Sequence, residues 1–301
     1  MVFASVKATS LSLATRYYPI LLKLQRNMAA KLQKRIEFYN FAAEKVDKRL
    51  ATKTDRPDFM TYILRNQEEG GKEGGPTMSR AEMHSTIGLF LIAGSETTAT
   101  MLSGTTYLLL TNPDKMQKLK DEIRGKFKSE DEITIDEVSR LPYLLAVLNE
   151  GLRIYPPVPT GFPRVVPAGG DVVSGYYLPE GTSAYVSQHA TNHSPRNFTD
   201  PDSFIPERWL APSSSSDSTS ITERYAADKK SAFQPFSFGP RNCLGKNLAY
   251  AEMRLIMAKM VWNFDMALAE GSEGWMERQK VFALWEKGAL EVRLTIVVGA
   301  R

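Results

Sequence analysis

The single cysteine of the chain, Cys243, lies in the segment FSFGPRNCLG, where its neighbours favour a reactive thiol. Gly239 and Gly245 allow the backbone to turn tightly and to approach a flat ligand. A helix predicted to begin near Lys246 would direct the positive end of its dipole toward the sulfur, and Arg241 adds a further positive charge. Both effects favour the thiolate, which is the form of cysteine that binds a metal or attacks an electrophile.

Several kinds of site compete for this cysteine. A buried, inert cysteine is the general expectation, although not for one in a glycine-flanked basic loop. A P-loop is excluded because five residues separate Gly239 from Gly245 and Asn247 replaces the Ser or Thr that would hold magnesium. A phosphatase loop would need its arginine after the cysteine. Zinc would need more soft ligands than one cysteine and three histidines supply, and His189 and His193 lie in a segment rich in Pro and Asn.

The remaining interpretation is iron in a porphyrin, because the macrocycle supplies the nitrogen ligands and one protein sulfur suffices. Such an iron activates dioxygen only if protons arrive on its other face. Glu96 and Thr97, an acid and a hydroxyl side by side in an apolar helix, could relay protons, and Gly94 one turn earlier leaves room for oxygen. The alternative is a threonine-rich kink whose hydroxyls bond to the preceding turn.

Glu150 and Arg153 are three residues apart and so share one face of an apolar helix, where either charge would be costly without a partner. Arg208, in the segment FIPERWL, is a candidate third member. It would hold the irregular chain before the cysteine loop against this helix. Taken alone, Glu150 and Arg153 would more often be a solvated surface pair.

These residues lie in a chain whose apolar periodicity is mostly helical. The pattern predicts helices at 19–50, 57–66, 79–112, 114–128, 141–155 and 246–262. A small β region is predicted over 158–188 with a hairpin around Pro179–Gly181, and a terminal hairpin after the Lys287–Gly288 turn. Residues 67–78 read as a glycine-rich loop and residues 211–230 as a polar surface loop.

The composition is that of an ordinary globular protein. The chain has 301 residues, of which 43% are apolar and 24% charged, with a net charge of +4. This excludes a disordered, collagenous or disulfide-stapled chain. The N-terminal apolar runs are interrupted by Lys7, Arg16 and Lys23, so neither a membrane span nor a signal peptide is predicted, and the chain is expected to be soluble.

Four motifs together resemble the cytochrome P450 family. They are AGSETT at 93–98, Glu150-x-x-Arg153, PERW at 206–209 and FSFGPRNCLG at 236–245, in the family's order and context. The resemblance extends from about Pro19 to the C-terminus. It implies a mainly α fold with a small β region, namely a single cytochrome P450 domain over 1–301 that lacks its N-terminal portion.

The resemblance also implies roles for particular residues. Cys243 would be the axial haem ligand, with Gly245 beside it and Phe236 packed against the loop. Arg241 and Arg164 would meet the haem propionates, Glu96 and Thr97 would be the oxygen-activating pair, and Glu150, Arg153 and Arg208 would form the family's structural triad. Substrate-facing positions are expected at 89–93, at 158–163 and near Leu284 and Trp285.

The implied activity is that of a haem-thiolate monooxygenase, which inserts one atom of dioxygen into an apolar organic substrate by hydroxylation or epoxidation. The sequences of the cysteine loop and of the AGSETT helix are similar to those of fungal microsomal enzymes of secondary metabolism, such as the trichothecene-type terpenoid hydroxylases. Electrons would come from NADPH through NADPH-cytochrome P450 reductase, which would dock on basic residues around the cysteine loop. The candidates are Lys229, Lys230, Lys246 and Arg254. No nucleic acid partner is expected.

The chain also departs from the family pattern. The membrane anchor, the first strands and the helices over one haem edge are expected to be missing, which would leave the haem partly uncovered and weakly held. The family implies the cytosolic face of the endoplasmic reticulum, whereas a chain without an anchor could be cytoplasmic. The alternatives are a truncated, catalytically impaired or non-catalytic haem-binding relative, and a haem-thiolate enzyme that uses peroxides without a reductase.

Overall fold

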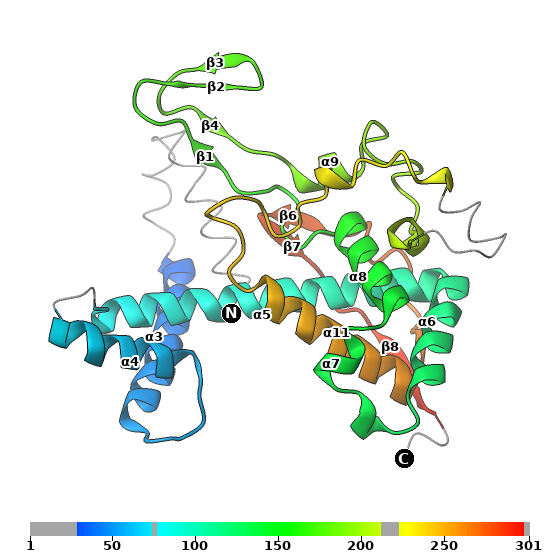
Figure 1. The fold of residues 1–301 in the computed structure, drawn as a ribbon, viewed down its shortest axis with the longest axis horizontal. Coiled ribbons are helices and arrows are strands. Elements are labelled where there is room, and N and C mark those ends of the chain that lie inside the picture. The colour runs from blue at the N-terminus through cyan, green and yellow to red at the C-terminus, as the bar shows by residue number, and fades with distance from the viewer. Residues whose placement is uncertain (1–28, 74–76, 212–222, 298–301) are drawn as a thin grey trace. The chain divides into compact units, whose positions relative to one another are not determined.

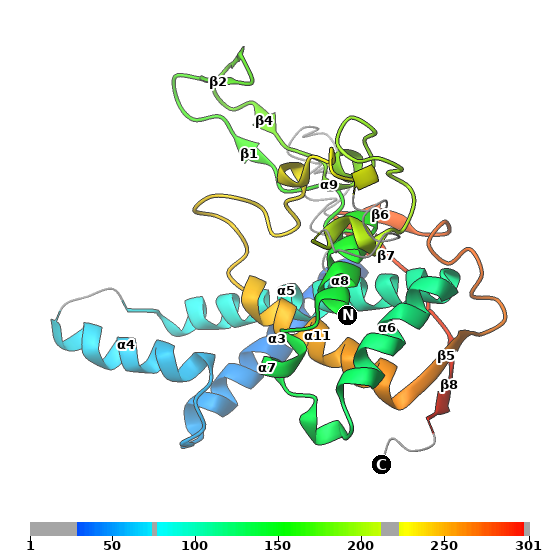
Figure 2. The same cartoon turned by 45° about the vertical axis from the view of Figure 1, so that its right-hand side comes forward.

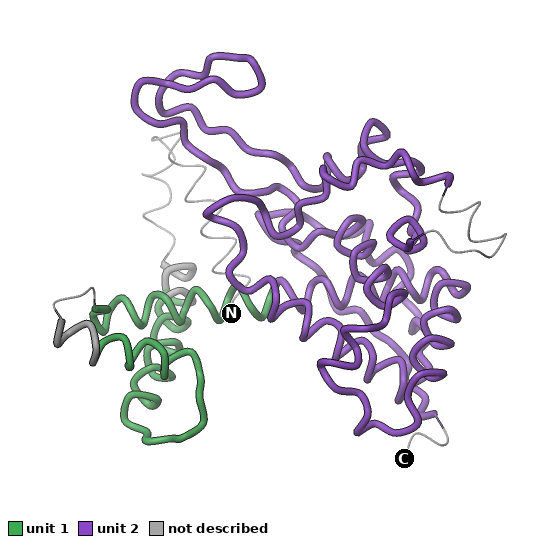
Figure 3. Tube along the Cα trace, viewed as in Figure 1, with its two compact units in different colours: residues 1–96 green, residues 97–301 purple. Residues whose placement is uncertain are grey.

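Figure 1 shows the protein as a computed structural model, which describes residues 29–73, 77–211 and 223–297. The chain forms two compact units, residues 1–96 and 97–301 (Figure 3). The helices are α3 (Ala29–Ala51), α4 (Phe59–Glu73), α5 (Arg80–Thr111), α6 (Pro113–Lys126), α7 (Ile135–Val138), α8 (Pro142–Ile154), α9 (Gln188–Asn192) and α11 (Lys246–Asn263). Short 3₁₀ helices are η1 (Glu130–Glu132), η2 (Pro206–Trp209) and η3 (Lys230–Ala232).

The strands form antiparallel pairs, β1 with β4, β2 with β3, β5 with β8 and β6 with β7. Their bounds are β1 (Arg164–Val165), β2 (Asp171–Val173), β3 (Tyr176–Leu178), β4 (Ser183–Ala184), β5 (Phe264–Leu268), β6 (Lys280–Phe282), β7 (Leu284–Glu286) and β8 (Val292–Ile296). The small β region predicted over 158–188 is therefore present as the first two pairs.

The helix predictions from 79 onward are confirmed by α5, α6, α8 and α11. Of the helix predicted over 19–50, the described part is α3, and its first residues lie outside the described part of the chain. The loop predicted over 67–78 is wrong in its first half, because α4 continues to Glu73. Two glycines inside a helix each cost only about 1 kcal/mol and do not end it by themselves. The Gln67 side-chain amide also donates to the carbonyl of Met78 at 2.9 Å, which holds the two ends of this connection together.

Two hairpin predictions are wrong because the partner of a strand is set by tertiary packing as well as by the nearest turn signal. The turn at Pro179–Gly181 joins β3 to β4, which pair with other strands. The actual hairpin turn is Ser174–Gly175, with both residues at positive φ as a type I′ turn requires. At the C-terminal end, β8 pairs with the distant β5 and not across the Lys287–Gly288 turn.

The core of the second unit is built from α6, α8, α11 and the second half of α5. Helix α11 packs against α6, α7 and α8 (Figures 1 and 2). The core residues of these helices include Leu109, Leu119, Val147 and Ala258, none of which has any exposed surface. Removal of this much apolar surface from water is the main stabilising contribution of the unit.

Helix α8 carries the predicted pair Glu150 and Arg153, and its two ends are defined by different features. Pro142 occupies its first turn, where the missing N–H costs nothing. The Glu122 carboxylate on α6 accepts from the backbone N–H groups of Tyr143 and Leu144 at 2.7 and 2.8 Å, which caps the helix. The helix ends just before two consecutive prolines. The position of α8 is therefore fixed by α6 at one end and by its own sequence at the other.

The first unit has its own small core, in which Val46, Met60 and Met83 are buried. Asp47 on α3 accepts from Arg80 and contacts His84 at 2.8 Å, both on α5, and these two contacts lower the pKa of Asp47. None of the helices in the described part of the chain has an apolar stretch long enough to span a lipid bilayer.

Candidate functional site

Cys243 lies in a closed turn between η3 and α11, and its side chain is exposed. The backbone N–H of Cys243 donates to the carbonyl of Phe236 at 2.8 Å, and that of Asn242 donates to Gly239 at 3.0 Å. Gly239 has φ 81°, a conformation that glycine adopts without strain. These two backbone hydrogen bonds and the conformation of Gly239 therefore shape the loop and hold the thiol at its surface.

The loop leads directly into α11. Gly245 is the N-cap of this helix and its carbonyl accepts from Ala249 at 2.8 Å. A Cβ placed on Gly245 would lie 4.0 Å from the sulfur of Cys243, so the thiol stands beside the helix start. The positive end of the helix dipole is then close to Cys243, as the sequence predicted.

Phe236 connects the loop to the rest of the unit. Its ring lies 5.2 Å from the ring of Tyr250 on α11, and the Lys246 ammonium lies 5.9 Å from its centroid. The Tyr250 hydroxyl donates to the side-chain oxygen of Asn149 on α8 at 2.8 Å. Burial raises the pKa of Tyr250 to about 12, so this hydroxyl remains a donor at any physiological pH.

The face around the thiol is apolar and open. Phe238 and Leu244 are 83% and 87% exposed, which is unusual for side chains of this size. Arg241 is exposed in the same loop, and Arg164 is exposed on β1, where it donates to the carbonyl of Pro163. Within the described part of the chain, neither guanidinium forms an ion pair.

Glu96 and Thr97 are consecutive residues of α5, and both are half-buried. Glu96 is the last residue of the first unit and Thr97 the first residue of the second. The hydroxyl of Ser103 bonds to the carbonyl of the preceding turn, which is the structural alternative considered for this segment. The hydroxyl of Thr100 instead accepts from the Lys287 ammonium at 2.9 Å, so the hydroxyls of this helix do not all serve its own backbone.

The structure brings Glu150, Arg153 and Arg208 into direct contact, and none of the three side chains has any exposed surface. Arg153 forms a two-pronged pair with Glu150, at 2.9 Å from Nε and 2.8 Å from Nη2. Arg208 donates from Nε to Glu150 at 3.1 Å. The solvated surface pair considered for Glu150 and Arg153 is therefore wrong, because the apolar neighbours of α8 bury this face.

Two further members of this cluster were missed from the sequence. The Trp209 indole N–H donates to Glu150 at 2.8 Å, and Asp228 forms an ion pair with Arg208 in which neither side chain is exposed. Asp228 falls in the loop predicted at 211–230. Residues 212–222 of that loop lie outside the described residues, and the prediction is wrong for Tyr225 and Asp228, which are buried. Polar composition predicted exposure, whereas the partner guanidinium of Asp228 is remote in sequence.

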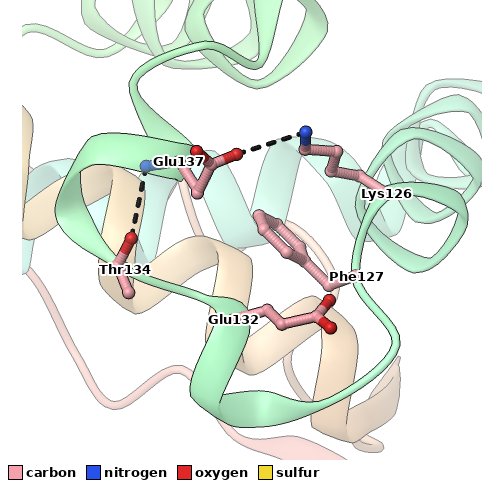
Figure 4. A pocket seen from close by; sticks show the side chains of 5 residues that line it. All are labelled: Lys126, Phe127, Glu132, Thr134 and Glu137. Carbon is pink, nitrogen blue, oxygen red and sulfur yellow. Dashed lines mark hydrogen bonds and ion pairs between the residues drawn. The ribbon is translucent and has the colours of Figure 1, made fainter.

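A pocket of about 360 Å³ lies elsewhere, between the end of α6, η1 and α7 (Figure 4). It is lined by Lys126, Phe127, Glu132, Thr134 and Glu137. Glu137 pairs with Lys126 at 3.2 Å, and Glu132 accepts from the backbone of Lys128 at 2.9 Å. Its polar groups thus serve neighbouring residues, and it contains none of the predicted site residues.

The rings of His189 and His193 lie with their centroids 4.0 Å apart and their planes tilted by 42°, and burial lowers the pKa of both. Within the described residues, no group of three or more His, Cys, Asp or Glu side chains is arranged so that it could hold a metal ion. The predicted site residues thus fall into two assembled groups, the Cys243 loop and the buried charge cluster. Arg164 lies on β1, and Glu96 and Thr97 lie on α5.

Comparisons with known proteins agree with this arrangement. The family model for cytochrome P450 matches residues 3–291. The chain is 47% identical over 296 residues to cytochrome P450 monooxygenase lcsI of Purpureocillium lilacinum, covering 98% of this chain and 54% of that protein. It is 51% identical over 267 residues to cytochrome P450 monooxygenase traB of Penicillium crustosum, covering 89% and 50%.

Among solved structures, the crystal structure of the cytochrome P450DA heme domain matches with a TM-score of 0.73 and 21% identity, over 98% of this chain and 60% of that one. The chain belongs to the cytochrome P450 family. The predicted family and the mainly α fold with a small β region are therefore confirmed. The chain spans about half the length of the curated relatives that it matches.

Proposed function

We propose that this chain carries the iron-ligand half of a haem-thiolate monooxygenase, and that Cys243 is the axial ligand. The observation that carries the proposal is the exposed thiol of Cys243, held by the Phe236 carbonyl in a closed turn at the start of α11. A lone exposed cysteine at a helix start, with apolar side chains open on both sides, suits a flat ligand bound through one sulfur.

The residues around Cys243 fit the haem that the family implies. Phe238 and Leu244 offer exposed apolar surface to a macrocycle, and Gly245 leaves the sulfur without a side chain beside it. Arg241 and Arg164 supply exposed guanidinium groups suited to two propionates. When bound, a haem with a thiolate ligand supplies the activation of dioxygen, because electron density from the sulfur favours cleavage of the O–O bond.

The test of this proposal is the carbon monoxide difference spectrum of the reduced chain after reconstitution with haem. The spectrum reports haem incorporation and thiolate ligation together. A thiolate-type band is the expected result. Haem that binds and shows only the band of a neutral ligand would contradict the proposal.

We assign proton delivery to Glu96 and Thr97 on α5. The Thr97 hydroxyl would donate its proton at Oγ1 and recover one from the Glu96 carboxyl, and both residues are half-buried. A Cβ on Gly94, one turn earlier, would meet no atom within 4 Å, which leaves room for a small ligand against the backbone.

Replacing Thr97 with Ala is expected to uncouple electron use from product formation in the haem-loaded protein. Without the hydroxyl the proton arrives late, so product per NADPH oxidised should fall about tenfold while peroxide rises. The measurement is the ratio of product to NADPH consumed. Thr97→Ser is the matched control and should keep the coupling, and Ser103→Ala, whose hydroxyl bonds only the preceding turn, should have no effect. Full coupling in Thr97→Ala would place the relay on other residues.

Electrons are proposed to come from NADPH through a reductase that docks on the basic residues near the Cys243 loop. Lys229, Lys230 and Lys246 are exposed and can meet acidic groups of a partner. Arg254 is less suitable, because its Nε is buried and its guanidinium lies 5.2 Å from the Tyr250 ring.

Reversing two of these charges, Lys229→Glu with Lys230→Glu, is expected to slow reduction of the haem-loaded protein roughly tenfold at low salt. The difference should shrink as salt is added, because screening weakens interactions between exposed charges. Stopped-flow reduction at several salt concentrations measures it. The matched control reverses two exposed charges between α3 and α4, Lys53→Glu with Arg56→Glu. Equal slowing in both double variants would argue against a docking site at Lys229 and Lys230.

The substrate is proposed to be an apolar small molecule of fungal secondary metabolism, hydroxylated or epoxidised by the whole protein at the cytosolic face of the endoplasmic reticulum. Support comes from the fungal monooxygenases among the relatives. Residues 89–93, 158–163, Leu284 and Trp285 remain the proposed substrate-facing positions. Trp285 is held in place by its indole N–H, which donates to the carbonyl of Pro156 at 2.7 Å.

A further inference from the structure

The buried charge cluster is neutral only when Asp228 is counted. Arg153 and Arg208 contribute two positive charges, and Glu150 alone would leave one of them uncompensated. Asp228 supplies the second negative charge, and all four side chains are fully buried. An uncompensated charge in such a place is strongly destabilising, so the carboxylate of Asp228 is an integral part of the cluster.

Asp228 also fixes the path of the backbone. Its Oδ2 accepts from Nη1 of Arg208, and its Oδ1 accepts from the backbone N–H of Thr199 at 2.7 Å. The same guanidinium donates to the carbonyl of Thr199 at 3.0 Å. Arg208 and Asp228 together therefore bind both the backbone carbonyl and the backbone N–H of Thr199. The next residue, Lys229, donates its backbone N–H to the carbonyl of Asn197 at 2.7 Å.

The segment anchored at Asp228 continues directly into the Cys243 loop. After η3, Phe233 packs on Trp209 with ring centroids 4.7 Å apart, and Trp209 donates to Glu150 of the cluster. Three residues further on, the Phe236 carbonyl accepts from the N–H of Cys243. The charge cluster therefore holds this segment at two points before the ligand loop begins, through Asp228 and through Phe233.

We propose that Asp228 is a positioning residue for Cys243. It fastens the start of the loop segment to the buried cluster and neutralises that cluster, and the order of the thiol loop depends on both effects. The proposal deepens the proposed function, since it rests on Cys243 as the ligand, although its main test does not require haem.

The test compares Asp228→Asn with Asp200→Asn in the full chain. The first change keeps the shape of the side chain and removes the charge that faces Arg208. The second removes the charge of a nearby carboxylate that is 34% exposed and pairs with Arg224. This carboxylate also accepts from the Tyr225 hydroxyl at 2.9 Å, and the amide oxygen of Asn can still accept that bond. Hydrogen exchange followed by mass spectrometry is read on peptides of the 233–245 loop and on peptides of the α11 core around Met257 and Val261.

Asp228→Asn is expected to speed exchange in the loop at least about tenfold more than in the α11 core, because the anchor is lost locally. Asp200→Asn should change neither by more than about twofold. Equal acceleration in the loop and in the α11 core would reveal a general loss of stability and overturn the proposal, as would no change. Asp228→Glu, which keeps the charge, should restore part of the loop protection. If the Asn variant does not fold, the Glu variant folding with a near-normal loop supports the proposal, and its failure as well overturns it.

A second measurement separates this proposal from the proposed function. In the haem-reconstituted chain, Asp228→Asn is expected to reduce the share of the thiolate-type carbon monoxide band at least about threefold relative to Asp200→Asn. Absence of that band already in the unmodified chain would count against Cys243 as the ligand, and the exchange result would still decide the anchor. An unchanged band in Asp228→Asn, with the unmodified chain showing it, would overturn the positioning role.

Discussion

Replacing Cys243 with Ser is expected to abolish the thiolate-type carbon monoxide spectrum that the proposed function predicts, and with it the proposed monooxygenase activity. A serine hydroxyl does not ionise near neutral pH and cannot supply the electron density that a thiolate gives to iron. Because the Cys243 side chain is exposed, its replacement should change the free energy of unfolding by no more than about 0.5 kcal/mol. The Cys243→Ser change is therefore expected to have a large effect on the chemistry of the site and almost no effect on the free energy of unfolding.

The matched control for this variant is Leu244→Ala, which alters the neighbouring exposed side chain and leaves the sulfur in place. It is expected to weaken haem retention and to keep the thiolate-type band in whatever haem remains. Urea unfolding of both variants without haem should coincide with that of the unmodified chain. A Cys243→Ser protein with an unaltered spectrum would remove the basis for assigning the ligand to this position.

The shape of the Cys243 loop could be predicted from the sequence because residues close to the cysteine determine it. A glycine that reaches positive φ, a helix start and an adjacent arginine lie within a few residues of the sulfur, so their effects could be read without knowing the fold. The long helix α5 was equally predictable, because its apolar run has no stop signal before Asn112 and Pro113.

Features that depend on distant partners could not be predicted in this way. Strand β8 reads as part of a local hairpin, yet its partner β5 precedes it by a long loop and the β6–β7 pair. Asp228 sits in a polar stretch that predicts exposure, and its burial depends on Arg208 and Thr199. In both cases the deciding contact is set by tertiary packing, which propensity and periodicity do not contain.

The charged pair on α8 shows that the residues around a motif can predict its burial when the spacing of the motif cannot. The chain contains two Glu-x-x-Arg motifs close together, Glu137 with Arg140 and Glu150 with Arg153. Their spacing is identical, yet Arg140 and Glu137 of the first pair are 68% and 31% exposed, whereas neither side chain of the second pair has any exposed surface. In the sequence, the apolar residues around Glu150 distinguish the two motifs. Such apolar neighbours predict burial, but they do not identify the buried partners of Glu150.

Replacing Glu150 with Gln should therefore destabilise the protein far more than the same change at Glu137. The neutral amide would leave Asp228 as the remaining carboxylate of the cluster to balance Arg153 and Arg208, and two guanidinium groups would lose ionised acceptors at 2.8 and 3.1 Å. Breaking a buried ion pair costs about 3–5 kcal/mol, which is a large share of the roughly 5–15 kcal/mol that keeps a domain folded.

The Glu137→Gln variant is the matched control, because it removes the same charge from the same spacing where Arg140 is 68% exposed. Its expected cost is below about 0.5 kcal/mol. Urea unfolding followed by circular dichroism measures both variants, and the Glu150→Gln variant should unfold at a much lower denaturant concentration or be unfolded from the start. Similar midpoints for the two variants would mean that the cluster is hydrated in solution. The Cys243 loop would then have to be held by its apolar contacts, Phe233 on Trp209 and Phe236 on Tyr250, without a fixed charge cluster behind them.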